Sequence, residues 1–159
     1  MTNTNNKNMG QIVLINGVVV DVLFSSKVPK IYNALNTTVN DKNIVLEVQS
    51  HLGNNVVRTI SMSSTDGLMV GQQVEDTGDY IQVPVGKDVL GRVLNVTGEL
   101  IDGGKDLPKD IQTKPIHANP PKFADQSSKI EVFETGLKVI DLLCPFIKGG
   151  KIAMFGGAG

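Results

Sequence analysis

The chain has 159 residues, enough for one domain or for a small domain joined to part of another. Its formal net charge is −1, so it offers no broad basic surface, and we expect no nucleic-acid partner and no direct attraction to an anionic membrane. The only cysteine, Cys144, excludes an internal disulfide and a cysteine-based metal site. Seventeen glycines with only 4% aromatic residues favour many short strands over a helical bundle.

Residues 1–9 are polar and rich in asparagine, and we expect them to form a disordered tail. They contain neither the apolar run of a secretory signal nor the arginine-rich amphipathic pattern of a mitochondrial transit peptide. If the protein associates with a membrane, we expect it to do so through partner proteins.

Residues 10–82 are predicted to form a β-barrel domain. Runs of β-branched residues predict strands at 12–15, 18–22, 44–48, 56–60 and 81–85. The sequence Gly53-Asn54-Asn55 is suited to a hairpin turn, because glycine and asparagine tolerate positive φ. Several short strands in succession favour a small closed barrel, since closure removes unpaired edges.

The pattern changes after residue 83. We expect a single helical turn at Asp88 and an extended, proline-rich connection that covers the surface of a second domain. No second ligand lies at metal spacing near His51 or His117, so both are interpreted as surface histidines and no metal site is predicted. Arg92 is expected to be structural, pairing across the junction between barrel and connection.

From residue 132 the pattern is that of an α/β domain. Thr135 is suited to cap a helix over 135–143, and Pro145 would end it. Residues 151–155 are predicted to form a buried strand of the parallel-sheet type. The sequence Gly156-Gly157-Ala158-Gly159 comes directly after this predicted strand. A P-loop also begins with glycine directly after a buried strand, and its backbone N–H groups surround phosphate oxygens. On this general pattern alone, a flexible glycine-rich tail remains the commoner interpretation.

A family resemblance favours the P-loop. The stretch 148–159, KGGKIAMFGGAG, resembles the corresponding segment of F-type ATP synthase β subunits, in which VGKT follows. Residues 135–143, TGLKVIDLL, and the LGRVLNV segment at 90–96 are similar to family segments in the same order. The non-catalytic α subunit carries a different loop sequence, and the vacuolar-type catalytic subunit has an insertion for which residues 83–159 leave no room.

The resemblance implies a mainly β N-terminal barrel followed by the start of an α/β P-loop domain of the RecA-like type, incomplete over 83–159. It implies that Gly156, Gly157, Ala158 and Gly159 belong to the cradle for ATP or ADP with Mg²⁺. The family's catalytic residues would lie after Gly159 or on another chain, so we expect no catalytic residue here and no tight nucleotide binding by these 159 residues alone.

The resemblance also implies partners and a location. The partners would be three α subunits in an alternating ring and the γ and ε subunits of the central stalk. The protein would lie on the cytoplasmic side of a bacterial inner membrane or, alternatively, on the matrix side of the mitochondrial inner membrane. A different class stays open, in which the chain is a free-standing, non-enzymatic β-barrel module for assembly.

Overall fold

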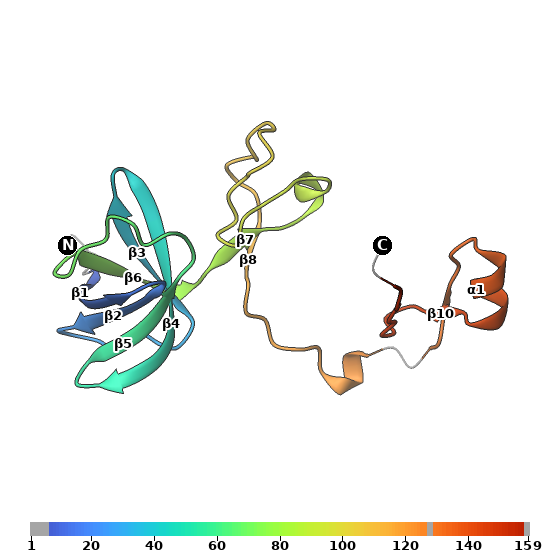
Figure 1. Ribbon diagram of the computed structural model, residues 1–159, viewed down its shortest axis with the longest axis horizontal. Coiled ribbons are helices and arrows are strands. Elements are labelled where there is room, and N and C mark those ends of the chain that lie inside the picture. The colour runs from blue at the N-terminus through green and yellow to red at the C-terminus, as the bar shows by residue number, and fades with distance from the viewer. Residues whose placement is uncertain (1–6, 127–128, 158–159) are drawn as a thin grey trace, which may run out of the picture. The chain divides into compact units, whose positions relative to one another are not determined.

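The computed structural model describes residues 7–126 and 129–157, and the chain divides into two units, Met1–Ala118 and Asn119–Gly159. The first unit contains a closed antiparallel barrel with the strand order β1-β2-β5-β4-β3-β6 (Figure 1). Its strands are β1 (Asn8–Asn16), β2 (Val19–Phe24), β3 (Asn33–Val39), β4 (Lys42–Gly53), β5 (Val56–Ser61) and β6 (Gln73–Tyr80). Because β6 pairs with both β1 and β3, no strand of the barrel has a free edge.

The barrel core is built from side chains that alternate along the strands, as the two-residue period of a strand requires. On β5, for example, Val57, Thr59 and Ser61 point inward and their neighbours point outward. The buried apolar cluster consists of Ile12, Val20, Val22, Phe24, Leu35, Ile44, Leu46, Val48, Val57 and Val74. Thr59 is fully buried, and its hydroxyl donates a hydrogen bond to the carbonyl of Val20 at 2.7 Å.

Two hairpin turns use the same backbone geometry. Asn54 and Asn55 have φ values of 48° and 61°, as do Asn40 and Asp41 between β3 and β4. Two consecutive residues at positive φ match the right-handed twist of the flanking strands, and Asn and Asp tolerate that conformation. The hairpin predicted at Gly53-Asn54-Asn55 is therefore confirmed, with β4 and β5 as its antiparallel strands.

The start of the barrel differs from the expectation. β1 begins at Asn8, so residues 8 and 9 of the expected tail belong to a strand that pairs with β6. Lys7 forms an ion pair with Glu75 at 2.9 Å. The remaining residues of the expected tail lie outside the described part of the chain.

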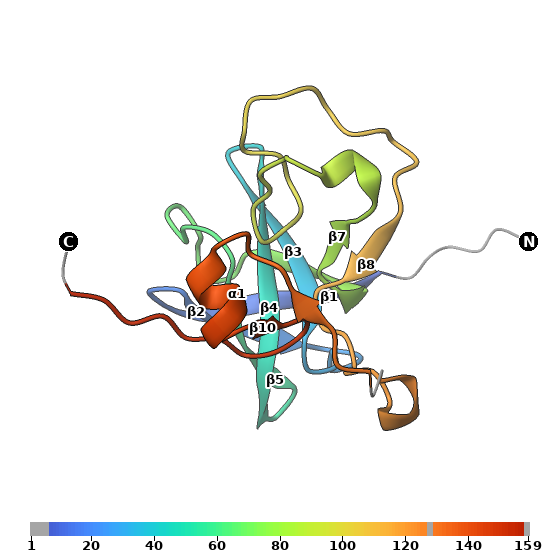
Figure 2. The same cartoon turned by 90° about the vertical axis from the view of Figure 1, so that its right-hand side faces the viewer.

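The strand predicted at 81–85 is shorter and lies outside the barrel. β7 (Gln82–Pro84) pairs with β8 (Thr113–Pro115), a strand of the proline-rich connection (Figures 1 and 2). The backbone N–H of Ile116 extends this ladder by donating to the carbonyl of Ile81 at 3.0 Å. The expected single helical turn is present as η1 (Lys87–Val89), with Gly86 instead of Asp88 at its N-cap.

Residues 119–126 and 129–157 of the second unit do not show the predicted start of a P-loop domain. These residues form η2 (Phe123–Asp125), the strand pair β9 (Val132–Phe133) and β10 (Phe146–Ile147), and the helix α1 (Lys138–Leu143). The strand predicted at 151–155 is wrong for this structure, because residues 151–157 have no regular secondary structure and Phe155 is 96% exposed. A single strand cannot form without neighbours to accept its hydrogen bonds, and the described chain supplies none there.

The helix is also shorter than predicted. It begins at Lys138 after the N-cap Leu137, which makes no side-chain capping bond, so Thr135 is not the cap. It ends at Leu143, ahead of Pro145 as expected. Leu142 and Leu143 are exposed, so neither side chain packs on a core within the described residues. Across residues 7–126 and 129–157, no helix combines the length and apolar character needed to cross a membrane.

Candidate functional site

The expected phosphate cradle is only partly within the described chain. Gly156 and Gly157 are exposed and have no regular secondary structure, whereas Ala158 and Gly159 lie outside the described residues. A Cβ atom added to Gly156 or Gly157 would meet no atom within 4 Å, so the space that a side chain would occupy at each glycine is open. A phosphate cradle needs N–H groups that converge at the start of a helix, and no helix adjoins this segment in the described chain. The described residues therefore form no phosphate cradle, and nucleotide binding at Gly156 to Gly159 stays a prediction.

The segment before α1 is ordered by a carboxylate from within the helix. Asp141 accepts hydrogen bonds from the Thr135 hydroxyl at 2.6 Å, from the Thr135 backbone N–H at 3.0 Å and from the Gly136 N–H at 2.9 Å. The hydroxyl bond from Thr135 is the main reason that the pKa of Asp141 is lowered, with the backbone bonds adding to it. The Thr135 hydroxyl thus donates to Asp141 and accepts a hydrogen bond from the Leu137 N–H. Together these bonds fix the turn that leads into the helix.

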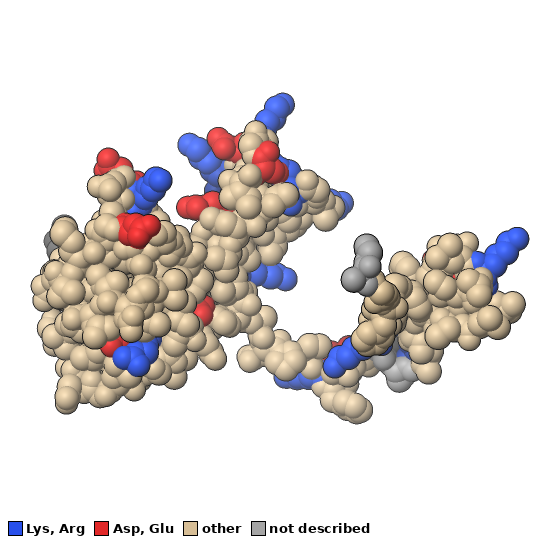
Figure 3. Space-filling model, viewed as in Figure 1, with Lys and Arg blue, Asp and Glu red and all other residues tan. Residues whose placement is uncertain are grey.

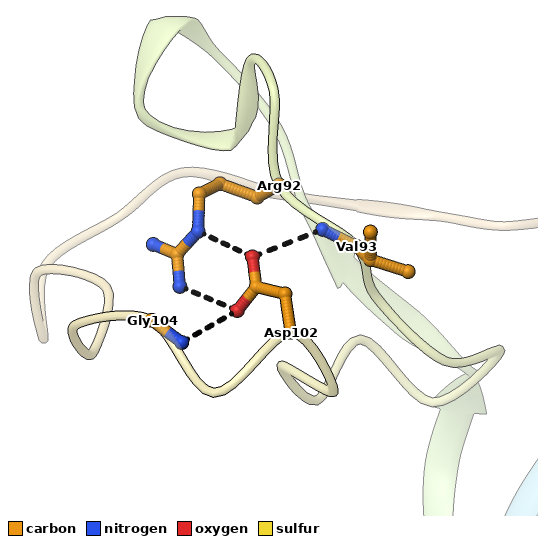
Figure 4. Close-up of polar contacts among 4 residues, drawn as sticks. All are labelled: Arg92, Val93, Asp102 and Gly104. Atoms are coloured by element: carbon orange, nitrogen blue, oxygen red, sulfur yellow. Dashed lines mark hydrogen bonds and ion pairs between the residues drawn. The ribbon is translucent and has the colours of Figure 1, made fainter.

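Arg92 and Asp102 form the most elaborate polar contact in the connection between the barrel and the second unit (Figure 4). The guanidinium donates Nε to one carboxylate oxygen at 2.7 Å and Nη2 to the other at 2.9 Å. The same carboxylate accepts the backbone N–H of Val93 at 3.2 Å and that of Gly104 at 3.0 Å. Four donors on one carboxylate hold together two chain segments that enter and leave a turn, since Leu94 and Leu100 bridge between them.

These donors also set the charge state of the pair. The hydrogen bond from Arg92 is the largest cause that lowers the pKa of Asp102, and the N–H bonds from Gly104 and Val93 lower it further. The bond to Asp102 in turn raises the pKa of Arg92. Arg92 is structural, as expected, but the expected partner is wrong: it closes a loop within the connection and does not pair across the junction with the barrel.

The two histidines each have a partner on the barrel. His51 Nε2 lies 2.7 Å from the carbonyl oxygen of Pro29, and His117 Nε2 lies 2.8 Å from Glu47 Oε2. The ring of His117 stacks on Tyr32 with centroids 4.2 Å apart. Neither arrangement gathers metal ligands, and the described residues hold no group of three or more His, Cys, Asp or Glu side chains suited to a metal ion.

Charge does not mark a binding face on the side shown in Figure 3. Lysine and arginine lie among aspartate and glutamate on the barrel, with extensive uncharged surface between them. One barrel pair is embedded in the sheet: Arg58 on β5 lies opposite Asp21 on β2 and binds both of its oxygens at 2.9 Å. This pairing raises the pKa of Arg58.

The closed six-stranded antiparallel barrel defines the first unit as a β-barrel domain, and a second unit follows it in the chain. A protein-family model described as "ATP synthase alpha/beta family, beta-barrel domain" matches residues 12–78, from β1 to β6. The match supports membership of the ATP synthase alpha/beta subunit family. It applies to alpha and beta subunits alike, so it does not distinguish between them.

Proposed function

We propose that this chain is the N-terminal part of the catalytic β subunit of an F-type ATP synthase. The barrel that matches the ATP synthase alpha/beta family over residues 12–78 is the observation that carries the proposal. The choice of β over α rests on the sequence KGGKIAMFGGAG at 148–159, which is similar to the β-subunit loop.

In this proposal the barrel is an assembly domain. Its exterior carries exposed apolar side chains on three neighbouring segments: Val13 and Leu14 at the β1 bulge, Val18 and Ile60 beside the β1–β2 turn, and Met69 and Val70 in the loop before β6. Hydrogen bonds bring these segments together, because Gly71 N–H donates to Ile12, Ser61 N–H donates to Val18 and the Thr65 hydroxyl donates to Gly17. Grouped apolar residues on a barrel with no free edge favour side-to-side packing against other subunits.

The partners would be α subunits alternating with this subunit in a ring, around a central stalk of γ and ε. The complete subunit would bind ATP or ADP with Mg²⁺, with Gly156 to Gly159 as the first half of its phosphate loop. Rotation of the stalk would drive ATP formation from ADP and phosphate. We place the complex on the cytoplasmic side of a bacterial inner membrane, with the mitochondrial matrix side as the alternative.

The coding DNA that follows the codon of Gly159 tests the β assignment directly. The proposal expects codons for Val-Gly-Lys-Thr, then a helix-forming segment, in frame or displaced by a single base. The α-type loop sequence at this position would place the chain in the other branch of the family. Unrelated sequence would instead support the free-standing barrel module.

A further inference from the structure

We propose that His117 is a latch that fastens the end of the connection to the barrel, and thereby fixes the point at which the segment Asn119-Pro120-Pro121 leaves the first unit. The inference rests on contacts within the first unit. It does not depend on the proposed function, since any barrel with this connection would need its exit point defined.

The polar part of the latch is a hydrogen bond to a nearly buried carboxylate. Glu47, on β4, is only 6% exposed, and a carboxylate taken from water needs partners. One oxygen lies 2.8 Å from His117 Nε2, and the other accepts from the Gln49 amide at 2.6 Å. His117 therefore supplies one of the two side-chain partners that compensate for the burial of this carboxylate.

The aromatic part of the latch holds the imidazole ring on two sides. Tyr32 stacks against the ring at a centroid distance of 4.2 Å and an interplanar angle of 25°, and Tyr80 meets it edge-on at 5.8 Å and 85°. Tyr32 has a φ of 69°, a conformation that is uncommon for a bulky residue and needs support from its surroundings. Its N–H donates to the Val48 carbonyl at 2.7 Å, which anchors this turn to β4. The groups that face His117 thus come from the turn before β3, from β4 and from β6.

The rest of the connection holds the chain weakly at this point. β7 and β8 each have three residues, and every residue of β8 is exposed. After Ala118 the two prolines have no backbone N–H to donate, and Asn119, Pro120 and Pro121 are all exposed. The boundary between the two units falls at this place, directly after the latch. A proline-rich segment beyond a fixed point acts as a semi-rigid spacer, so the position of His117 sets where that spacer begins.

Amide hydrogen exchange of the complete 159-residue chain, followed residue by residue, tests the latch. The reporter is the Ile116 N–H, which donates to the Ile81 carbonyl next to His117. The Met62 N–H, which donates to the Val45 carbonyl inside the barrel, reports on the barrel itself. In His117→Ala, exchange at Ile116 should accelerate roughly 10-fold while Met62 keeps its protection, because a stacked ring and a hydrogen bond to a carboxylate are lost locally.

Two further variants separate the parts of the latch. His117→Phe keeps the stacking and loses the bond to Glu47, whereas His117→Gln keeps a hydrogen-bond donor and loses the stacking, so each should accelerate Ile116 less than His117→Ala does. Lys114→Ala, an exposed change on β8, is the matched control and should leave both reporters unchanged. Unchanged exchange at Ile116 in His117→Ala would overturn the proposal. Equal acceleration at Ile116 and Met62 would also overturn it, since His117 would then stabilise the barrel as a whole.

Discussion

Gly10 lies on β1 with its missing side chain directed at the barrel core, where space is already filled. A Cβ atom added there would lie 2.8 Å from Phe24 Cζ, 2.8 Å from Val22 Cγ1 and 2.9 Å from Phe24 Cε1. Both neighbours are fully buried, so neither can move aside into solvent. Gly10 has no positive φ, so the substitution Gly10→Ala tests packing without backbone strain.

Two effects compete in Gly10→Ala. Alanine restricts the unfolded chain and would stabilise the protein by about 0.4–1 kcal/mol. Overpacking of a filled core costs about 1–3 kcal/mol. Because the contacts are below 3.0 Å and involve an enclosed ring, we expect the packing cost to dominate, with a net loss of about 1–2 kcal/mol. For a domain the size of the barrel, each kcal/mol lowers the unfolding midpoint by roughly 4–8 °C.

The assay is thermal and urea unfolding, with Phe24→Leu as the second side of a double-mutant cycle. Removal of the ring atoms should make Gly10→Ala less costly in the Phe24→Leu background than in the natural one. Gly157→Ala is the control, since a Cβ there meets nothing, and it should change stability by less than about 0.5 kcal/mol. A Gly10→Ala variant as stable as the natural protein would refute the filled core at this position.

Three other perturbations address the connection, the turns and the exterior. The pKa of Asp102 is lowered in the folded chain, so its contribution to folding stability is present above the unfolded pKa of about 3.9 and is lost as the pH falls below that value. The Val93 and Gly104 amide resonances should shift in that acid range in the natural protein and not in Asp102→Asn, and unshifted resonances in the natural protein would contradict this. Asn55→Val places a β-branched residue at a φ of 61° and should cost about 1–2 kcal/mol in urea unfolding, whereas Asn55→Gly should be nearly neutral; equal stabilities would exclude a strained turn. The double variant Met69→Asp/Val70→Asp changes side chains that are 68% and 65% exposed, so the barrel should remain folded by circular dichroism. Co-purification with α subunits should be lost, and retained co-purification would show that this loop is outside the interface.

The strands that sequence predicted are those with a regular apolar pattern and a recognisable turn. Residues 44–48 and 56–60 met both conditions, and both lie within observed strands. β6 was missed because it is a polar strand that contributes a single side chain, Val74, to the core cluster. Its strand conformation is set by pairing with a strand on each side. β3 was missed because Asn and Thr dominate its second half, although the Asn40-Asp41 pair after it carries the same turn signal as Asn54-Asn55.

The polar contacts show a similar division. Arg92 and Asp102 lie ten residues apart on either side of a turn. Opposite charges at so short a separation can be paired from sequence once the turn between them is recognised. Glu47 and His117 are separated by 70 residues, and only the path of the connection brings them together. The strand predicted at 151–155 was wrong for a different reason, since an apolar run becomes a strand only where other strands accept its hydrogen bonds.

Assembly tests the proposed function most directly. The complete subunit of the proposal can be tagged at its N-terminus and co-expressed with the α, γ and ε subunits of an F-type ATP synthase. The product is purified through the tag, and its mass is measured by native mass spectrometry. The proposal predicts a complex with three copies of this subunit and three of α around one central stalk. Recovery of the tagged protein alone, or as an oligomer of itself only, would contradict it.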